Sequence, residues 1–216
     1  MESERFFCAL ACIAMGYFIG NFSPSYLVGL LLGYDVRDEG SHNAGASNTL
    51  ILAGKTAGLL VAVTDIFKAW AAWRMAQWLF PKLVLAGVIS GSACVIGHMY
   101  PVFLRFRGGK GFACLGGMVL AHGTGSFICL FSVAIVLVLL LKYVSVVAST
   151  MAFLFPLWYL VTGGMVLGAM ILLIPAATML CKHMENFRRI RTGQELRISF
   201  LWDKSGELER IGQSEN

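Results

Sequence analysis

The sequence predicts an all-α integral membrane protein: a bundle of about seven transmembrane helices, with the N-terminus outside and the C-terminus in the cytoplasm. Of its 216 residues, 57% are hydrophobic and only 13% are charged, and the mean hydropathy is +0.73. A soluble domain carries about 25% charged residues, so the composition argues against a water-soluble enzyme. Intrinsic disorder requires low hydrophobicity and high net charge, so a disordered chain is excluded.

Three apolar stretches in the first half of the chain are long enough to cross a bilayer, which takes about 20 apolar residues. Residues 6–34 contain no Asp, Glu, Lys, Arg or His. Residues 56–80 are interrupted only by Asp65, Lys68 and Arg74, and residues 83–104 carry only His98 near one end. Each stretch therefore predicts one span.

Glycines divide the apolar second half of the chain. Residues 111–141 contain one ionisable side chain, His122, within the segment Ala-His-Gly-Thr-Gly. Glycine is unfavourable inside a helix, so this stretch predicts two short helices, the alternative being one tilted helix. Residues 143–181 are uncharged, and as a single helix they would measure about 58 Å. We therefore expect two spans there, with the turn at Gly163-Gly164.

The basic residues give the orientation, because Lys and Arg are enriched on the cytoplasmic side of membrane proteins. With seven spans, one side receives only Arg5, Arg74 and Lys82. An even number of spans would remove this asymmetry. We expect a multi-pass protein of the inner (cytoplasmic) membrane whose active site faces the cytoplasm. The basic residues on that side are Arg37, Lys55, Arg105, Arg107, Lys110, Lys142, Lys182, Arg188, Arg189 and Arg191.

Two polar loops on the predicted cytoplasmic side suggest binding sites. The first motif, residues 40–48, combines glycines, amides and hydroxyls, and its alternative interpretation is an ordinary turn cluster. The glycine–lysine loop, residues 105–111, has three cations and three glycines. Such a backbone nest suits phosphate, although it could also anchor anionic lipid headgroups. It is not a Walker A loop, because Leu104 replaces the first Gly and Gly111 follows Lys110.

Two further polar groups lie in or beside predicted spans. Asp65 and Lys68 are three residues apart and can pair on one helix face, so a structural pair and a ligand-binding role both stay open. The segment 182–186, Lys-His-Met-Glu-Asn, leaves the last span and could serve in proton transfer or anchor the membrane boundary. All of these except the Asp65/Lys68 pair fall on one face. We therefore expect remote segments to meet in one cavity that holds two phosphoryl groups.

In order and spacing, these segments resemble the bacterial acyl-phosphate:glycerol-3-phosphate acyltransferase family (PlsY). The resemblance extends from about residue 17 to residue 196, and the third matching stretch is the most specific. The stretches are G-S-H-N-A-G-A-S-N at 40–48, D-I-F-K at 65–68, G-H-M-Y-P-V-F-L-R-F-R-G-G-K-G at 97–111, K-Y-V-S at 142–145 and K-H-M-E-N at 182–186.

The resemblance implies a seven-helix bundle that transfers a fatty acyl group from acyl phosphate to the 1-hydroxyl of glycerol 3-phosphate, giving lysophosphatidic acid. Neither acyl-CoA nor acyl carrier protein would be the direct donor. Acyl phosphate is already activated, so catalysis can rest on positioning and charge stabilisation. His183 is the obvious base, and a substrate phosphate is the alternative. Catalytic roles are expected for His183, Asn186 and Ser145, and substrate binding for Ser41, Asn43, Asn48, Lys68, His98, Gly108, Gly109, Lys110 and Gly111.

The chain departs from the family pattern at four positions. His42 and Ala69 stand where the family usually has Gly, and Met184 where Arg is common. Ile51 replaces an Arg, and a guanidinium is a natural bidentate clamp for phosphate. Three explanations stay open: His42 or another cation compensates, the acceptor differs, or the activity is weak.

We expect one acyltransferase domain, residues 1–196, followed by a polar cytoplasmic tail, residues 197–216. The expected partners are acyl phosphate, glycerol 3-phosphate and membrane lipids. No cofactor, metal site or nucleic-acid partner is predicted, and the six cysteines show no metal-binding spacing. Two competing functions are a catalytically altered paralogue that takes a different acceptor or binds lipid, and a transporter of small phosphorylated anions. Acyl-chain preference and oligomeric state stay open.

Overall fold

The computed structural model describes residues 2–213, which form helices joined by turns and irregular segments. The elements, in chain order, are α1 (Glu2–Asn21), α2 (Pro24–Leu31), α3 (Ala46–Ala53), α4 (Lys55–Leu79), α5 (Ala86–Met99), η1 (Val102–Leu104), α6 (Phe112–His122), α7 (Thr124–Leu141), α8 (Val144–Val161), α9 (Val166–Arg191), η2 (Ile198–Leu201) and α10 (Lys204–Gln213).

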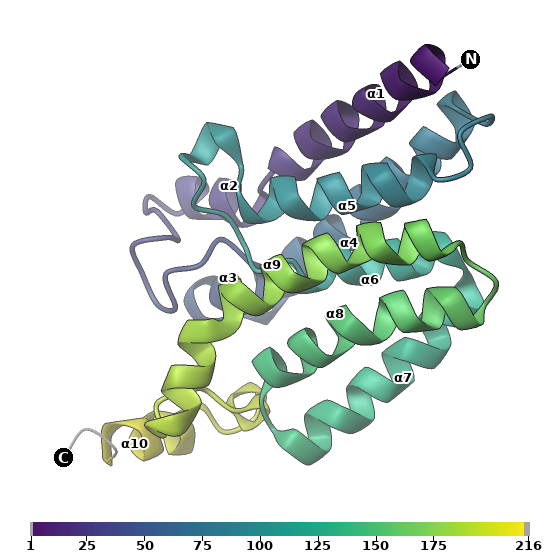
Figure 1. Cartoon of the computed structure of the whole chain (residues 1–216). Helices are drawn as coiled ribbons and strands as arrows, with labels where there is room; N and C mark the ends of the chain where they lie inside the picture. The colour runs from purple at the N-terminus through teal and green to yellow at the C-terminus, as the bar shows by residue number, and fades with distance from the viewer. Residues whose placement is uncertain (1, 214–216) are drawn as a thin grey trace.

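The chain runs back and forth between two ends of the bundle (Figure 1). One end holds the N-terminus and the α4–α5 and α8–α9 turns. The other end, called the loop end below, holds residues 32–45, 100–111, 142–143 and 192–213. Every polar segment singled out in the sequence except the Asp65/Lys68 pair therefore lies at or beside the loop end.

Within residues 2–213, five helical segments are long and apolar enough to cross a membrane: Glu2–Leu31, Ala86–Leu104, Thr124–Leu141, Val144–Val161 and Val166–Arg191. Helix α4 has 25 residues and is long enough, but its charged residues lower its hydropathy. Helix α6 has 11 residues, a length of about 16 Å. The all-helical membrane architecture is thus confirmed, whereas the count of seven spans stays a prediction.

The predicted glycine breaks are confirmed. Helix α6 ends at His122 and α7 begins at Thr124, so residues 111–141 form two helices. Helices α8 and α9 are separated by a turn that includes Gly163 at φ +89° and Gly164. His122 Nε2 lies 2.8 Å from Thr162 Oγ1 and closes the two turns against each other.

The first predicted span matches the candidate span Glu2–Leu31, but two helices share it. Helix α1 ends at Asn21, and Ser23 caps α2 by accepting a hydrogen bond from Tyr26 N at 3.3 Å. Pro24 at the start of α2 has no N–H to continue the α1 ladder. Hydropathy alone predicts one uninterrupted helix here, whereas the proline ends the first helix.

Close backbone contact joins α1 to α5. A Cβ on Gly16 would overlap the carbonyl of Ser90, and one on Gly20 would overlap the carbonyl of Cys94. Glycines four residues apart allow helices to approach in this way within a membrane. This packing holds His98, at the end of α5, against the break between α1 and α2.

Candidate functional site

The polar segments that are distant in the sequence meet at the loop end. Gly109 touches His98 of α5 and Ala44 of the first motif, since a Cβ on Gly109 would overlap His98 Nε2 and lie 3.0 Å from Ala44 O. Its neighbour Lys110 donates a hydrogen bond from Nζ to Asn186 Oδ1 on α9 at 2.5 Å. The first motif, the glycine–lysine loop and α9 therefore come together as expected, whereas a shared cavity for two phosphoryl groups stays a prediction.

Asn48 fixes the path of the first motif. Its side-chain oxygen accepts a hydrogen bond from Ser41 N at 2.8 Å, and its nitrogen donates to Val36 O at 2.6 Å and to Glu39 O at 3.1 Å. The residue is completely buried. Because its amide is engaged with backbone groups, Asn48 shapes the loop that presents Ser41 and Asn43, which are both half-buried.

His42 occupies a strained position in this loop. Its φ is +54°, in the left-handed region that non-glycine residues adopt at a cost of about 1–2 kcal/mol. The side chain is exposed. This geometry gives a physical reason why glycine suits the position.

A buried charge network lies behind the glycine–lysine loop. Lys68 Nζ lies 2.7 Å from Asp65 Oδ1 and 3.0 Å from His98 Nδ1, and it donates to Phe22 O at 2.6 Å. Asp65, Lys68 and His98 are at most 5% exposed. Asp65 and Lys68 therefore form a buried ion pair, and the ammonium is also hydrogen-bonded to His98 and Phe22. The substrate-binding role expected for Lys68 stays a prediction.

The network determines which nitrogen of His98 carries the proton. An ammonium group can only donate, so His98 Nδ1 accepts from Lys68 and the hydrogen of the neutral ring lies on Nε2. That Nε2–H group faces Gly109. His98 therefore supports the glycine–lysine loop from inside the protein.

One potential metal-binding group lies in the same place. The ligand atoms of Asp65, His98 and Cys114 are all within 4.8 Å of one another. The Lys68 ammonium sits beside two of them and supplies the positive charge.

The backbone of the glycine–lysine loop differs from the predicted nest. Gly108 N donates to Met99 O at 3.3 Å and Gly109 N donates to His98 O at 3.0 Å, so both N–H groups are used within the protein. By position, the first N–H groups of α6 lack intrahelical partners. The groups of this loop that suit an anion are therefore Lys110 and the start of α6, which follows Gly111 at φ +91°.

Lys110 lies in an electrostatic environment that weakens its hold on the proton. Burial lowers the pKa of Lys110 to about 8, and the charges of Arg189 and Lys182 act in the same direction, against opposing contributions from Glu195 and Glu185. A phosphate dianion placed beside the ammonium would raise this pKa again, because an opposite charge favours the protonated form. Lys110 is thus a cation that an anionic ligand would stabilise.

On the α9 side, Asn186 is held by a carboxylate that the sequence analysis missed. Asn186 Nδ2 donates to Glu195 Oε1 at 2.6 Å, and Arg189 Nε donates to Glu195 Oε2 at 2.9 Å. Glu195 is buried at 9% exposure. Its signal in the sequence was faint: one acidic residue in the otherwise basic stretch 188–197.

His183 lies one turn before Asn186 and is suited to accept a proton. Its Nδ1 lies 2.8 Å from Met179 O, and a carbonyl can only accept, so Nδ1 carries the hydrogen. The neutral ring therefore presents an unprotonated Nε2. His183 and Asn186 are both buried on the face of α9 that meets Lys110.

Ser145 stands in the first turn of α8, after Lys142 and Tyr143. Its hydroxyl is buried and has no hydrogen-bond partner among residues 2–213. Helix α8 packs along α9, but no hydrogen bond within the described part of the chain joins Ser145 to His183 or Lys110. Ser145 is thus a buried hydroxyl available to a ligand.

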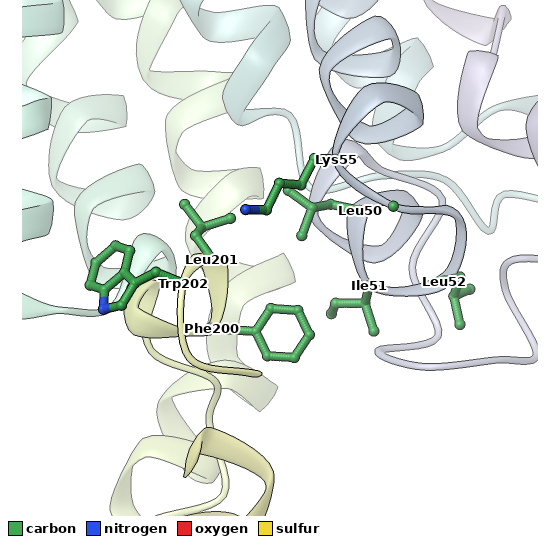
Figure 2. A pocket seen from close by; sticks show the side chains of 8 residues that line it. Leu50, Ile51, Leu52, Lys55, Phe200, Leu201 and Trp202 are labelled. Atoms are coloured by element: carbon green, nitrogen blue, oxygen red, sulfur yellow. The ribbon is translucent and has the colours of Figure 1, made fainter. Parts of the chain in front are cut away.

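Ile51, where the family pattern has Arg, lines a separate pocket. The pocket has a volume of about 390 Å³ and lies between the end of α3 and the η2 segment. In Figure 2, Ile51 and Phe200 face each other across it, and the Lys55 ammonium points toward Leu201. Lys55 is therefore a cation close to the position that lacks the guanidinium.

Comparisons with known proteins agree with this geometry. The profile of the glycerol-3-phosphate acyltransferase family matches residues 10–193. The glycerol-3-phosphate acyltransferase of Alkaliphilus metalliredigens is 36% identical over 196 residues, covering 88% of this chain and 95% of the relative. That of Bordetella petrii is 35% identical over 199 residues, covering 89% and 94%.

Two solved structures share the fold. The glycerol 3-phosphate form of PlsY (YgiH), an integral membrane glycerol 3-phosphate acyltransferase, superposes with a TM-score of 0.82 at 33% identity, covering 89% of this chain and 96% of that one. The lysophosphatidic acid form gives 0.79 at 32% identity, covering 95% and 99%. With its motifs meeting at one end of the same helical bundle, the chain belongs to the glycerol-3-phosphate acyltransferase family.

Proposed function

We propose that this protein is a membrane glycerol-3-phosphate 1-O-acyltransferase that uses acyl phosphate as donor and forms lysophosphatidic acid for phospholipid synthesis. The observation that carries the proposal is the bond from Lys110 to Asn186, because it places a phosphate-seeking cation within one helical turn of His183. Relatives crystallised in a glycerol 3-phosphate form and a lysophosphatidic acid form support the same substrate and product.

The proposed topology has seven spans: α1 with α2, then α4, α5, α6, α7, α8 and α9. Helices α4 and α6 complete the alternation between the two ends of the bundle in Figure 1. The positive-inside rule supports a cytoplasmic loop end in the inner membrane and an external N-terminus. Residues 1–196 would form the catalytic domain, and residues 197–216 a cytoplasmic tail, of which 214–216 lie outside the described residues.

The proposed phosphate site uses groups from three segments. Lys110 and the start of α6 would supply positive charge. The first motif would add Ser41 and Asn43, since Asn43 lies beside Gly45 and Gly45 lies beside Gly109. Gly108, Gly109 and Gly111 keep the backbone close to His98, Ala44 and α9, where side chains would collide. Asn48, Lys68 and His98 act as positioning residues behind these groups.

In the proposed reaction, O1 of glycerol 3-phosphate attacks the carbonyl carbon of the acyl phosphate. The new C–O bond forms as the bond from the acyl carbon to the phosphate oxygen breaks, and inorganic phosphate leaves. His183 Nε2 accepts the proton of the attacking hydroxyl, with the substrate phosphate as the alternative acceptor. Asn186 and Lys110 hold the phosphate that lies beside His183, and Ser145 offers its hydroxyl to the donor.

The decisive experiment incubates the purified protein with palmitoyl phosphate and labelled glycerol 3-phosphate in the absence of CoA. Labelled lysophosphatidic acid is the expected product. Lys110→Met should raise the KM for glycerol 3-phosphate at least tenfold, as loss of a charged contact of about 1.5–3 kcal/mol predicts. Lys82→Met, an exposed lysine at the other end of the bundle, is the matched control and should leave the KM unchanged.

Other outcomes identify the competing functions. Binding of glycerol 3-phosphate without product indicates the altered paralogue, and movement of the labelled anion into sealed vesicles indicates a transporter. If product forms, Lys55→Met tests whether the cation beside Ile51 compensates for the missing guanidinium. A rise in the KM for either substrate would support compensation, and an unchanged KM would exclude Lys55.

A further inference from the structure

The C-terminal segment, residues 197–213, lies outside the family match yet is bonded closely to the loop end. Its central element is the pair Glu207 and Arg210 on α10. Arg210 Nη2 donates to Glu207 Oε2 at 2.8 Å, and Glu207 is 6% exposed. Glu207 Oε1 also accepts from Ser199 Oγ at 2.6 Å, and Oε2 from Arg197 N at 3.3 Å. This pair, a buried carboxylate and a half-buried guanidinium, fixes α10 to the preceding segment, residues 197–203.

The same guanidinium also holds the turn that follows α9. Arg210 Nη1 donates to Gly193 O at 2.5 Å, and Nη2 donates to Glu195 O at 2.7 Å. The two carbonyls lie on either side of Gln194. The side-chain carboxylate of Glu195 in turn accepts a hydrogen bond from Asn186 Nδ2. A continuous chain of bonds therefore runs from α10 through Glu195 and Asn186 to Lys110.

A second attachment joins the segment to the start of α8. Ile198 N donates to Lys142 O at 2.8 Å, and Arg197 Nε donates to Tyr143 Oη at 3.3 Å. The Arg197 guanidinium also lies 5.8 Å from the centre of the Tyr143 ring. Ser145 follows two residues later. In Figure 1 the yellow segment accordingly passes from the end of α9 to the α7–α8 turn before it reaches α10.

We propose that residues 197–213 form a positioning clamp for the reaction centre, in which Arg210 and Glu207 hold the Gly193–Glu195 turn and thereby orient Asn186 and Lys110. Arg210, Glu207 and Arg197 are positioning residues and touch no substrate. The clamp ties the helix that carries His183 and Asn186 to the helix that carries Ser145. This inference rests on the proposed function for its kinetic consequence and on the hydrogen bonds alone for its structural one.

The test compares full-length variants in phospholipid nanodiscs, with glycerol 3-phosphate and palmitoyl phosphate as substrates. Arg210→Gln removes the guanidinium and its four hydrogen bonds to Glu207, Gly193 and Glu195. It should raise the KM for glycerol 3-phosphate about tenfold, with a smaller change in kcat. Glu207→Gln should have a weaker effect in the same direction. Glu209→Gln is the matched control, because Glu209 is an exposed residue of the same helix, and it should behave as the wild type.

Two readouts separate a positioning role from a general loss of stability. Arg210→Lys keeps the charge but cannot reach two carbonyls and a carboxylate at once, so it should not restore the KM. Glu195 is among the groups that raise the pKa of Lys110, against Arg189 and Lys182. The pH at which the KM rises should therefore move downward in Arg210→Gln and stay fixed in Glu209→Gln.

Amide hydrogen exchange supplies a result that does not depend on catalysis. In Arg210→Gln, exchange should accelerate across residues 193–198, including Ile198 N, while α4 and α5 keep their protection. The clamp would be overturned if Arg210→Gln kept the KM, the pH midpoint and the exchange rates of the wild type. It would also be overturned if Arg210→Lys restored the wild-type KM in full. If the wild type shows no acyl transfer, the proposed function fails, and the exchange result alone decides whether the clamp exists.

Discussion

Replacing Lys68 by methionine tests the buried network behind the glycine–lysine loop. The Lys68 ammonium is 5% exposed and contacts Asp65 Oδ1, His98 Nδ1 and Phe22 O within 3.0 Å. Methionine has a similar length but no charge and no donor. The substitution leaves the Asp65 carboxylate, which is 1% exposed, without its cation.

The expected loss of stability follows from that uncompensated charge. Removing one partner of a buried ion pair costs about 3–5 kcal/mol, and the two neutral acceptors lose hydrogen bonds as well. The double variant Asp65→Asn/Lys68→Met removes both charges, so it should be more stable than Lys68→Met alone by about 1–2 kcal/mol. The non-additivity is the specific prediction.

The measurement is reversible unfolding in detergent micelles for the two single variants, the double variant and Lys82→Met. The exposed Lys82 controls for loss of a lysine as such. Nitrogen NMR of His98 gives a second readout. Without the Lys68 donor, the ring should no longer be held in the Nε2–H form and should populate both neutral tautomers.

Two results would refute this reasoning. One is a cost below about 1 kcal/mol for Lys68→Met, which is the value of an exposed pair. The other is a double variant that loses the sum of the two single effects, which would show that Asp65 and Lys68 do not act as a pair.

Three further predictions concern the site itself. Because burial lowers the pKa of Lys110 to about 8, the KM for glycerol 3-phosphate should rise as the pH increases above that value and the ammonium loses its charge; Lys110→Arg should abolish this rise. His183→Ala should lower kcat about 10²–10⁴-fold, the usual contribution of a general base, with little change in KM, and an unchanged rate at saturating substrate would remove His183 from the mechanism. Gly109→Ala should abolish activity because its Cβ would overlap His98 Nε2, whereas Gly116→Ala, whose nearest atom lies at 3.7 Å, should retain it; equal activities would show that the loop approach is not required.

The sequence predicted those features that depend on composition and on glycine. The breaks at Gly123 and Gly163 follow from local backbone preference, and the gathering of the polar segments follows from their shared side of the membrane. The family resemblance added the order of the motifs. The glycine breaks, in particular, are properties that a single segment carries by itself.

The features that were missed depend on contacts between segments. Gly108 N and Gly109 N are occupied only because the loop folds back onto the end of α5. Glu195 gains its role from Asn186 and Arg189 on the preceding helix. Asn48 resembles a ligand-binding amide in the sequence, and only the path of residues 36–41 reveals that its hydrogen bonds are already used.

The interruption between α1 and α2 has a consequence for the buried lysine. In a continuous helix, the carbonyl of Phe22 would already accept from the amide four residues ahead. Ser23 and Pro24 end that ladder, and the freed oxygen completes the coordination of the Lys68 ammonium. The break between α1 and α2 thereby provides a hydrogen-bond acceptor for a buried cation on α4. We expect that removing the break would destabilise the charged Lys68, and that removing Lys68 would leave the Phe22 carbonyl without its partner.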